Sequence, residues 1–314
     1  MSRRAWAAFA VMSLVWGGSY LLIKIAIQGG MTPLDVAWVR IALAAAILAA
    51  ISLRPGALAS LRGRRRWVLA YAVAEMSIPF PLIALGEVHV ASSLTAIIIA
   101  SVPLLVTLLS LRLDPSERPT PIRAAGLIVG FVGVVALVGI DVSGSLGELL
   151  GALAIFGGAC GYAAGPIIVK LGMDGIDARL AMGSSLAVAT VLLAPAAVID
   201  GPARAPSAGA LAAVATLGVV CTALAFVVYT ILVREAGTAR ATIITYINPL
   251  VAVILGVWLL GERPGALALG GLVAILVGSW LSTTGRLPWS GRAAAEPPAG
   301  RARAVAGEKR QGDW

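Results

Sequence analysis

Two charged residues lie deep inside strongly apolar stretches of this chain. Glu75 lies within the run 67–86, and Arg40 lies about 10 Å inside the run 34–53 at helical rise. Ionisable side chains in such stretches are energetically costly, so each is a candidate for function. The two could bind substrate groups of opposite charge, and Glu75, the only carboxylate that we expect so deep, could carry a proton. The alternative is an ion pair between them that only holds two segments together.

Aromatic and cationic residues recur at helical spacing in the first apolar run. Trp16, Tyr20 and Lys24 are four residues apart, which places them on one helix face. This face could stack on a substrate and pair with its carboxylate. Alternatively, Trp16 and Tyr20 pack in the core and Lys24 extends its ammonium group to the outer interface. For Lys24 we favour the second interpretation, because it lies near the end of its run.

Prolines inside apolar runs indicate irregular backbone. Each removes a backbone donor and frees the carbonyl four residues earlier, which in lipid needs a partner or a polar cavity. We therefore predict helix breaks at four prolines, namely Pro79, Pro103, Pro166 and Pro249. The carbonyl freed by Pro166 belongs to Tyr162, which we include among the candidate substrate contacts.

Three polar residues precede Pro249, namely Thr245, Tyr246 and Asn248. Apolar residues occupy the corresponding positions of the first half of the chain, so symmetry between the halves does not require this polarity. We therefore predict that the three contact a substrate. Hydrogen bonding between helices is the alternative.

Composition excludes several classes of protein. The chain has 314 residues, of which 59% are hydrophobic and 12% charged, with a mean hydropathy of +0.95. A chain so poor in charge cannot cover a water-facing surface, so lipid must be its main solvent. One histidine and two separate cysteines form no catalytic or metal-binding cluster. We expect no enzyme activity, cofactor or metal, and no nucleic-acid partner, because the basic residues lie in short loops and the tail.

Ten apolar runs are long enough to cross a bilayer. We predict an all-α integral membrane protein with ten transmembrane helices, near 5–27, 34–53, 67–86, 90–111, 122–140, 148–169, 179–199, 208–233, 238–260 and 265–284. Glu87 and His89 fall in the short outer joint between the third and fourth runs, where we expect His89 to be solvated. With the N-terminus inside, 20 of the 24 Lys and Arg residues lie on the cytoplasmic side, which favours two cytoplasmic termini.

The sequence contains an internal duplication. Lys24 and Lys170, like Pro103 and Pro249, are 146 residues apart, and the triplet Glu117-Arg118-Pro119 recurs as Glu262-Arg263-Pro264. Five spans in each half is an odd number, so residues 5–140 and 148–284 are predicted to be inverted-topology repeats. Residues 286–314 are rich in Arg, Ala, Gly and Pro and are predicted to form a disordered cytoplasmic tail.

The layout resembles the EamA family of the drug/metabolite transporter superfamily across residues 5–284. The resemblance rests on Trp16-Gly17-Gly18-Ser19, on Arg40, on the run from Ala91 to Pro103, and on the doubled Glu-Arg-Pro triplets with the glycines that follow them. The first half departs from the family pattern at Asp114-Pro115-Ser116-Glu117, where a glycine usually precedes the glutamate. The resemblance implies ten spans, cytoplasmic termini, a central cavity, and transport of small organic molecules.

The combined prediction is a secondary transporter of the cell membrane. We expect it to move a small, amino-acid-like metabolite by alternating access, with export as the favoured direction; drug efflux and a structural role are the alternatives. The partners would be the lipid bilayer and a small-molecule substrate, with proton coupling possible and a monomer or homodimer as the assembly. The predicted substrate-binding residues are Trp16, Tyr20, Arg40, Glu75, Tyr162, Thr245, Tyr246 and Asn248.

Overall fold

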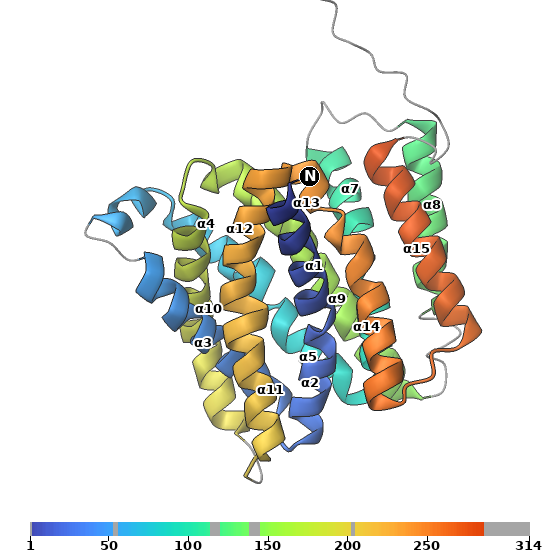
Figure 1. The fold of residues 1–314 in the computed structure, drawn as a ribbon, viewed down its shortest axis with the longest axis horizontal. Helices are drawn as coiled ribbons and strands as arrows, with labels where there is room; N and C mark the ends of the chain where they lie inside the picture. The colour runs from blue at the N-terminus through green and yellow to red at the C-terminus, as the bar shows by residue number, and fades with distance from the viewer. Residues whose placement is uncertain (1, 53–55, 114–119, 138–144, 202–204, 286–314) are drawn as a thin grey trace, which may run out of the picture.

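The structure is a computed structural model that describes residues 2–52, 56–113, 120–137, 145–201 and 205–285. All regular structure in these ranges is helical, and the helices form one bundle (Figure 1). The predicted tail 286–314 and the first-half motif residue Glu117 lie outside the described residues.

Eight helical segments are long and apolar enough to cross a membrane. Three of them are single helices, Pro33–Ser52 (α3), Ala178–Asp200 (α10) and Ala266–Thr284 (α15). Three consist of two elements each: Arg3–Gln28 of α1 (Arg3–Gly17) and α2 (Ser19–Gln28), Ser92–Leu113 of α6 (Ser92–Ile99) and α7 (Val102–Leu113), and Leu146–Met173 of α9 (Leu146–Ile168) and η4 (Val169–Met173). Two consist of three elements each: Arg65–His89 of α4 (Arg65–Tyr71), η2 (Ala72–Ser77) and α5 (Pro79–His89), and Ala208–Ala236 of α11 (Ala208–Gly218), η5 (Val219–Leu224) and α12 (Ala225–Ala236).

Two further helices are apolar but shorter, Pro121–Ala136 (α8) and Ile244–Leu260 (α14), the second of which follows α13 (Thr238–Ala241). These two occupy the places of the predicted fifth and ninth spans. A short 3₁₀ helix, η1 (Ala57–Leu61), precedes the third segment.

The four prolines expected to break helices behave in two ways. Pro79 and Pro103 lie in the first turns of α5 and α7, which the missing proline N–H permits. Pro166 and Pro249 lie inside α9 and α14, so the prediction of a helix break at these two is wrong. Membrane helices tolerate proline where neighbouring groups satisfy the freed carbonyl.

Two π-helical segments occupy related positions in the two halves of the chain. The segment η2 runs from Ala72 to Ser77 and η5 from Val219 to Leu224, so the two have the same length and begin 147 residues apart. Insertions of this kind widen a helix locally and are frequent at functional sites. Glu75 lies in η2 and Thr222 lies at the same place in η5.

Glycines allow α8 and α15 to approach closely. A Cβ on Gly126 would lie 2.8 Å from the carbonyl oxygen of Gly278, and one on Gly133 would lie 3.0 Å from that of Gly271. A Cβ on Gly278 would overlap the backbone of Gly130. Close backbone approach through small residues is the usual way in which membrane helices associate, because lipid provides no hydrophobic drive between them.

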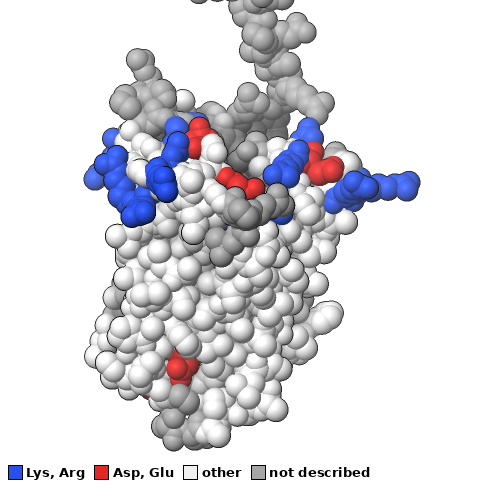
Figure 2. Space-filling model, turned by 90° about the vertical axis from the view of Figure 1, so that its left-hand side faces the viewer, with Lys and Arg blue, Asp and Glu red and all other residues white. Residues whose placement is uncertain are grey.

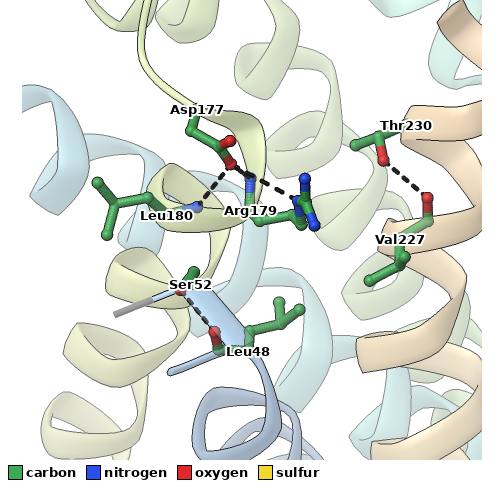
Figure 3. Close-up of polar contacts among 7 residues, drawn as sticks. All are labelled: Leu48, Ser52, Asp177, Arg179, Leu180, Val227 and Thr230. Carbon is green, nitrogen blue, oxygen red and sulfur yellow. Dashed lines mark hydrogen bonds and ion pairs between the residues drawn. The ribbon is translucent and has the colours of Figure 1, made fainter. Parts of the chain in front are cut away.

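Helix ends meet beside the joint between η4 and α10 (Figure 3). Asp177 Oδ1 accepts from the backbone N–H of Leu180 at 3.4 Å and so caps α10, while the Ser52 hydroxyl donates to the Leu48 carbonyl at 2.5 Å near the end of α3. A Cβ on Gly183 would lie 3.2 Å from Leu48 Cβ, so α3 and α10 are in contact there. These local bonds satisfy backbone groups that helix ends leave free.

Charge is unevenly distributed over the surface. Figure 2 shows Lys and Arg gathered at one end of the face in view, next to a broad band of uncharged side chains. Large apolar side chains are exposed on the surface, Trp258 at 82% and Val191 at 72% among them. Exposed apolar bands of this kind fit a lipid environment, which supports a multi-pass membrane protein.

The glycine contacts predict an asymmetry between two substitutions in α15. Gly278→Ala places a methyl group against the backbone of Gly130, and we expect it to destabilise the protein by about 1–3 kcal/mol. Gly270→Ala is the matched control, because nothing lies within 4 Å of its Cβ position. Thermal unfolding of the detergent-purified variants would measure the difference. Equal unfolding midpoints for the two variants would contradict this account of the α8–α15 interface.

Candidate functional site

Arg40 contacts the seventh segment, Ala208–Ala236, and an aromatic ring. The side chain is 9% exposed, and its Nε donates a 2.8 Å hydrogen bond to the Thr222 hydroxyl in η5. That hydroxyl in turn donates to the Leu217 carbonyl at 2.8 Å. The guanidinium carbon lies 4.4 Å from the centroid of the Phe80 ring, a cation–π contact. The ion pair with Glu75 that the sequence suggested is not formed among the described residues.

Glu75 is left with an unpaired carboxyl oxygen. Its Oε2 is buried and has no hydrogen-bond partner in the part of the chain that the structure describes. A Cβ on Gly165 of α9 would overlap this oxygen, so the absence of a side chain at Gly165 makes room for the carboxyl group. An unpaired buried oxygen is costly, because its lost hydration is not replaced.

Tyrosines gather around these two charged residues. Tyr162 of α9 lies edge-on to Phe80 at 6.3 Å and interacts electrostatically with Arg40, Tyr20 and Glu75. We call the whole group the central cluster; it comprises Tyr20, Arg40, Tyr71, Glu75, Phe80, Tyr162, Thr222 and Tyr229, the last of which packs against Trp16 at 5.4 Å. It contains four of the five tyrosines of the chain.

The central cluster thus brings together four predicted substrate contacts, Tyr20, Arg40, Glu75 and Tyr162, and places Trp16 at its edge. Sequence reasoning missed Tyr71, Phe80, Thr222 and Tyr229. Thr222 occupies in η5 the place that Glu75 occupies in η2, a relation that the structure alone reveals.

The three polar residues before Pro249 do not share one surface. The Thr245 hydroxyl donates to the Thr242 carbonyl at 2.7 Å, and the Tyr246 ring lies 6.2 Å from Trp280 of α15. Asn248 lies against α1, since a Cβ on Gly17 would be 2.9 Å from its carbonyl oxygen. Its side-chain Oδ1 is buried and unpartnered among the described residues, so Asn248 alone of the three retains a free acceptor inside the bundle.

Lys24 binds the joint between α5 and α6, residues 87–93, which we call the corner. Its Nζ donates to the carbonyls of Glu87 at 2.5 Å and of Val90 at 3.0 Å, in the joint that the sequence analysis placed on the outer side. Carbonyls at a helix end lack partners within the helix, and the ammonium group satisfies them. The Glu87 side chain is fully buried, unlike the neighbouring His89, which is exposed. The Glu87 side chain is therefore buried in the bundle, although the sequence analysis placed it in a short joint.

Glu262 caps α6 from the opposite half of the chain. Its carboxylate accepts from the backbone N–H groups of Ser92 at 2.8 Å and Ser93 at 2.9 Å, and from the Ser92 hydroxyl at 2.8 Å. Ala91, the residue before α6, has no side-chain acceptor to do this. Burial alone would raise the pKa of Glu262, but the hydrogen bonds from Ser93 and Ser92 outweigh it and hold this pKa below its ordinary value.

A cavity of about 250 Å³ lies beside this corner, and its lining includes His89, Glu148 and Glu262. Val90, whose carbonyl binds Lys24, also lines it. The corner therefore lines the cavity through Val90 and also contains the buried Glu87, whose carbonyl binds Lys24.

The capping bonds predict an acid-sensitive contribution from Glu262. Because its pKa is lower in the folded protein than in the unfolded chain, the ionised carboxylate stabilises the fold at neutral pH, and this contribution is lost as the pH falls through the lowered pKa. Glu262→Gln should cost about 1 kcal/mol at pH 7, as loss of a helix cap does, and progressively less in acid. Unfolding midpoints against pH measure this, with the exposed neighbour Arg263→Gln as control. A constant deficit at every pH would contradict the charge-based cap.

Comparisons with known proteins agree with this architecture. The family model described as the EamA-like transporter family matches twice, over residues 4–139 and 149–284. The chain is 29% identical over 289 residues to the "Uncharacterized inner membrane transporter YedA" of Escherichia coli K12, covering 86% of this chain and 88% of that protein. It is 29% identical over 286 residues to a "Probable terminal-alkyne amino-acid exporter" of Streptantibioticus cattleyicolor, covering 88% and 92%.

A solved crystal structure aligns with a TM-score of 0.63 at 20% identity over 90% of this chain and 98% of the other, which indicates a shared fold. The family model covers most of the sequence in two matches that flank the joint between α8 and α9. The chain belongs to the EamA-like transporter family.

Proposed function

We propose that this protein is a secondary transporter that moves an amino-acid-like zwitterion across the cell membrane by alternating access, in the direction of export. The observation that carries the proposal is the central cluster, in which the buried Arg40 side chain and the buried, unpaired Oε2 of Glu75 lie beside Tyr162 without pairing with each other. A guanidinium group binds carboxylates well, and a carboxylate binds ammonium groups. Aromatic faces around them would hold the ammonium and apolar parts of the substrate.

The zwitterion is favoured over a cationic drug, the alternative substrate class, for a specific reason. A cation that lacks a carboxylate would pair with Glu75 but would also face the buried charge of Arg40, which is unfavourable. The similarity to a protein named as a probable amino-acid exporter supports the same substrate class and direction.

The proposed architecture has ten spans in two inverted repeats, 5–140 and 148–284, with α8 and α14 crossing the membrane as well. The contacts between α8 and α15 support the repeat relation. At an offset of 145 residues Gly126 corresponds to Gly271 and Gly133 to Gly278, so the Gly126–Gly278 contact is converted into the Gly133–Gly271 contact. Such an exchange of partners is what a two-fold axis between the repeats requires.

The repeat-related π-helical segments suggest where the backbone moves. Glu75 lies in η2, and Thr222, the partner of Arg40, lies in η5. A change in either segment would move one of the two charged groups relative to the other. We propose that these segments adjust together as the site changes the side to which it opens.

The orientation predicts the outcome of labelling from one side. In a background without Cys160 and Cys221, cysteines at Arg62 and Ala205, both exposed positions, should react with a membrane-impermeant maleimide from opposite sides. Arg62 should be protected in intact cells and Ala205 should be labelled. Labelling of both from outside would contradict ten spans with cytoplasmic termini.

The substrate class predicts a pattern of competition. Purified protein in liposomes should take up one of a panel of labelled amino acids. An analogue with a blocked amine, and one whose carboxylate is replaced by a carboxamide, should each compete at least tenfold more weakly than the unmodified amino acid, since hydrogen bonds to charged groups contribute about 1.5–3 kcal/mol each. Glu75→Gln should abolish discrimination against the amine-blocked analogue, and Arg40→Gln against the carboxamide. The exposed Glu235→Gln is the matched control, because Glu235 binds Ser2 at the bundle surface. Equal competition by amines without a carboxylate would favour drug efflux instead.

A further inference from the structure

We propose that Glu87 is a proton-binding site of the transport cycle, placed where α5 meets α6. This inference rests on the proposed transport function, to which it adds the coupling ion. Its position differs from that of the central cluster, since Glu87 lies three turns beyond Glu75 along the third segment.

The first observation is complete burial without a partner. Glu87 is 0% exposed, and within the described ranges neither of its carboxyl oxygens has a hydrogen-bond partner. A buried ionised carboxylate is stable only when it is paired and hydrogen-bonded. In this conformation the group therefore carries a proton.

The second observation is the arrangement of charged groups around Glu87. Glu87 interacts electrostatically with Lys24 and Tyr20 of α2, with Arg40 of α3, and with Glu262 in the loop between α14 and α15. The helix α9 contributes Gly151 and Ile155 against the adjacent Gly86. His89 on the same helix and Glu148 of α9 line the nearby cavity.

The nearest cations make no hydrogen bond to the Glu87 carboxyl group. Lys24 Nζ is bound to the main-chain carbonyls of Glu87 and Val90, and Arg40 Nε is bound to Thr222. Glu262 carries negative charge near Glu87 and is itself held by Ser92 and Ser93. Burial and the negative charge of Glu262 disfavour ionisation of Glu87, and Lys24 and Arg40, whose charges favour it, make no hydrogen bond to its carboxyl group while the corner stays intact.

A movement of the corner would change the balance between the protonated and the ionised form of Glu87. Lys24 binds carbonyl groups of the corner and Glu262 binds its amide groups. Val90 lines the cavity, whereas Glu87 is not among the described residues that line it. When the corner separates from Lys24, water reaches Glu87, its O–H bond breaks and the proton passes to water on the cavity side. The freed ammonium group of Lys24 then pairs with the new carboxylate. Return of the corner requires the proton to bind again, which couples the conformational change to protons.

A substrate-independent experiment tests the protonation state. Infrared difference spectra of the full-length protein in liposomes, recorded between acid and alkaline pH, should contain the C=O band of a protonated carboxyl group. Glu87→Gln should remove one such band at neutral pH, whereas Glu75→Gln, the second buried carboxyl, should leave that band in place. Because glutamine resembles the protonated acid in shape and charge, Glu87→Gln should fold. If the neutral-pH band survives in Glu87→Gln, or never appears in the wild type, the proposal is wrong.

A transport measurement separates this proposal from the proposed function. Once a transported amino acid is identified, Glu87→Gln should retain exchange of labelled for unlabelled substrate. The flux driven by a pH gradient should fall at least tenfold relative to the wild type. Gradient-driven flux at the wild-type level would overturn proton coupling at Glu87 and leave transport established. Failure of the wild type to transport any amino acid would overturn the proposed function, while the infrared result would still decide whether Glu87 holds a proton. Lys24→Met provides the complementary variant, in which the band should persist to higher pH because the carboxylate has lost its counter-ion.

Discussion

The hydrogen bond from Arg40 to Thr222 determines the arrangement of the central cluster. A guanidinium group inside an apolar bundle must be held by acceptors or aromatic faces, and here one hydroxyl and the Phe80 ring do so. Because Arg40 is engaged by η5, Glu75 stays unpaired beside the tyrosines. An ion pair between the two would have been a structural link between helices; without it, both groups remain available for the substrate contacts that we propose.

Small residues make this arrangement possible. Gly165 leaves room for the Glu75 carboxyl group, and Gly86 lets α5 approach α9, since a Cβ there would lie 2.6 Å from the Gly151 carbonyl oxygen. The same feature that brings membrane helices close thus also creates space for buried polar groups. Packing and site construction depend on the same glycines, so substitution at Gly165 would affect both.

Sequence alone located the membrane segments well and the polar contacts poorly. Apolar run length is a local property, and both ends of seven of the eight long segments lie within three residues of the predicted runs. The partner of Arg40 is 182 residues away and is presented by a π-helical turn that no local pattern revealed. Glu87 was expected in a joint, but α5 continues to His89 because Lys24 and Glu262, distant in sequence, satisfy the two sides of the corner.

The stripe predicted from Trp16 to Lys24 connects the two buried carboxyl groups. Trp16 packs on Tyr229 near Glu75, Tyr20 interacts with Tyr162, and Lys24 binds the corner at Glu87. The stripe crosses the joint between α1 and α2 at Gly18, so it is not one rigid rod. A rotation at this joint that withdraws Lys24 from the corner would also shift Tyr20 against the central cluster. Release of a proton at one end and rearrangement of the substrate site at the other would then follow from a single backbone movement, which is the physical requirement for coupling two ligands in one transporter.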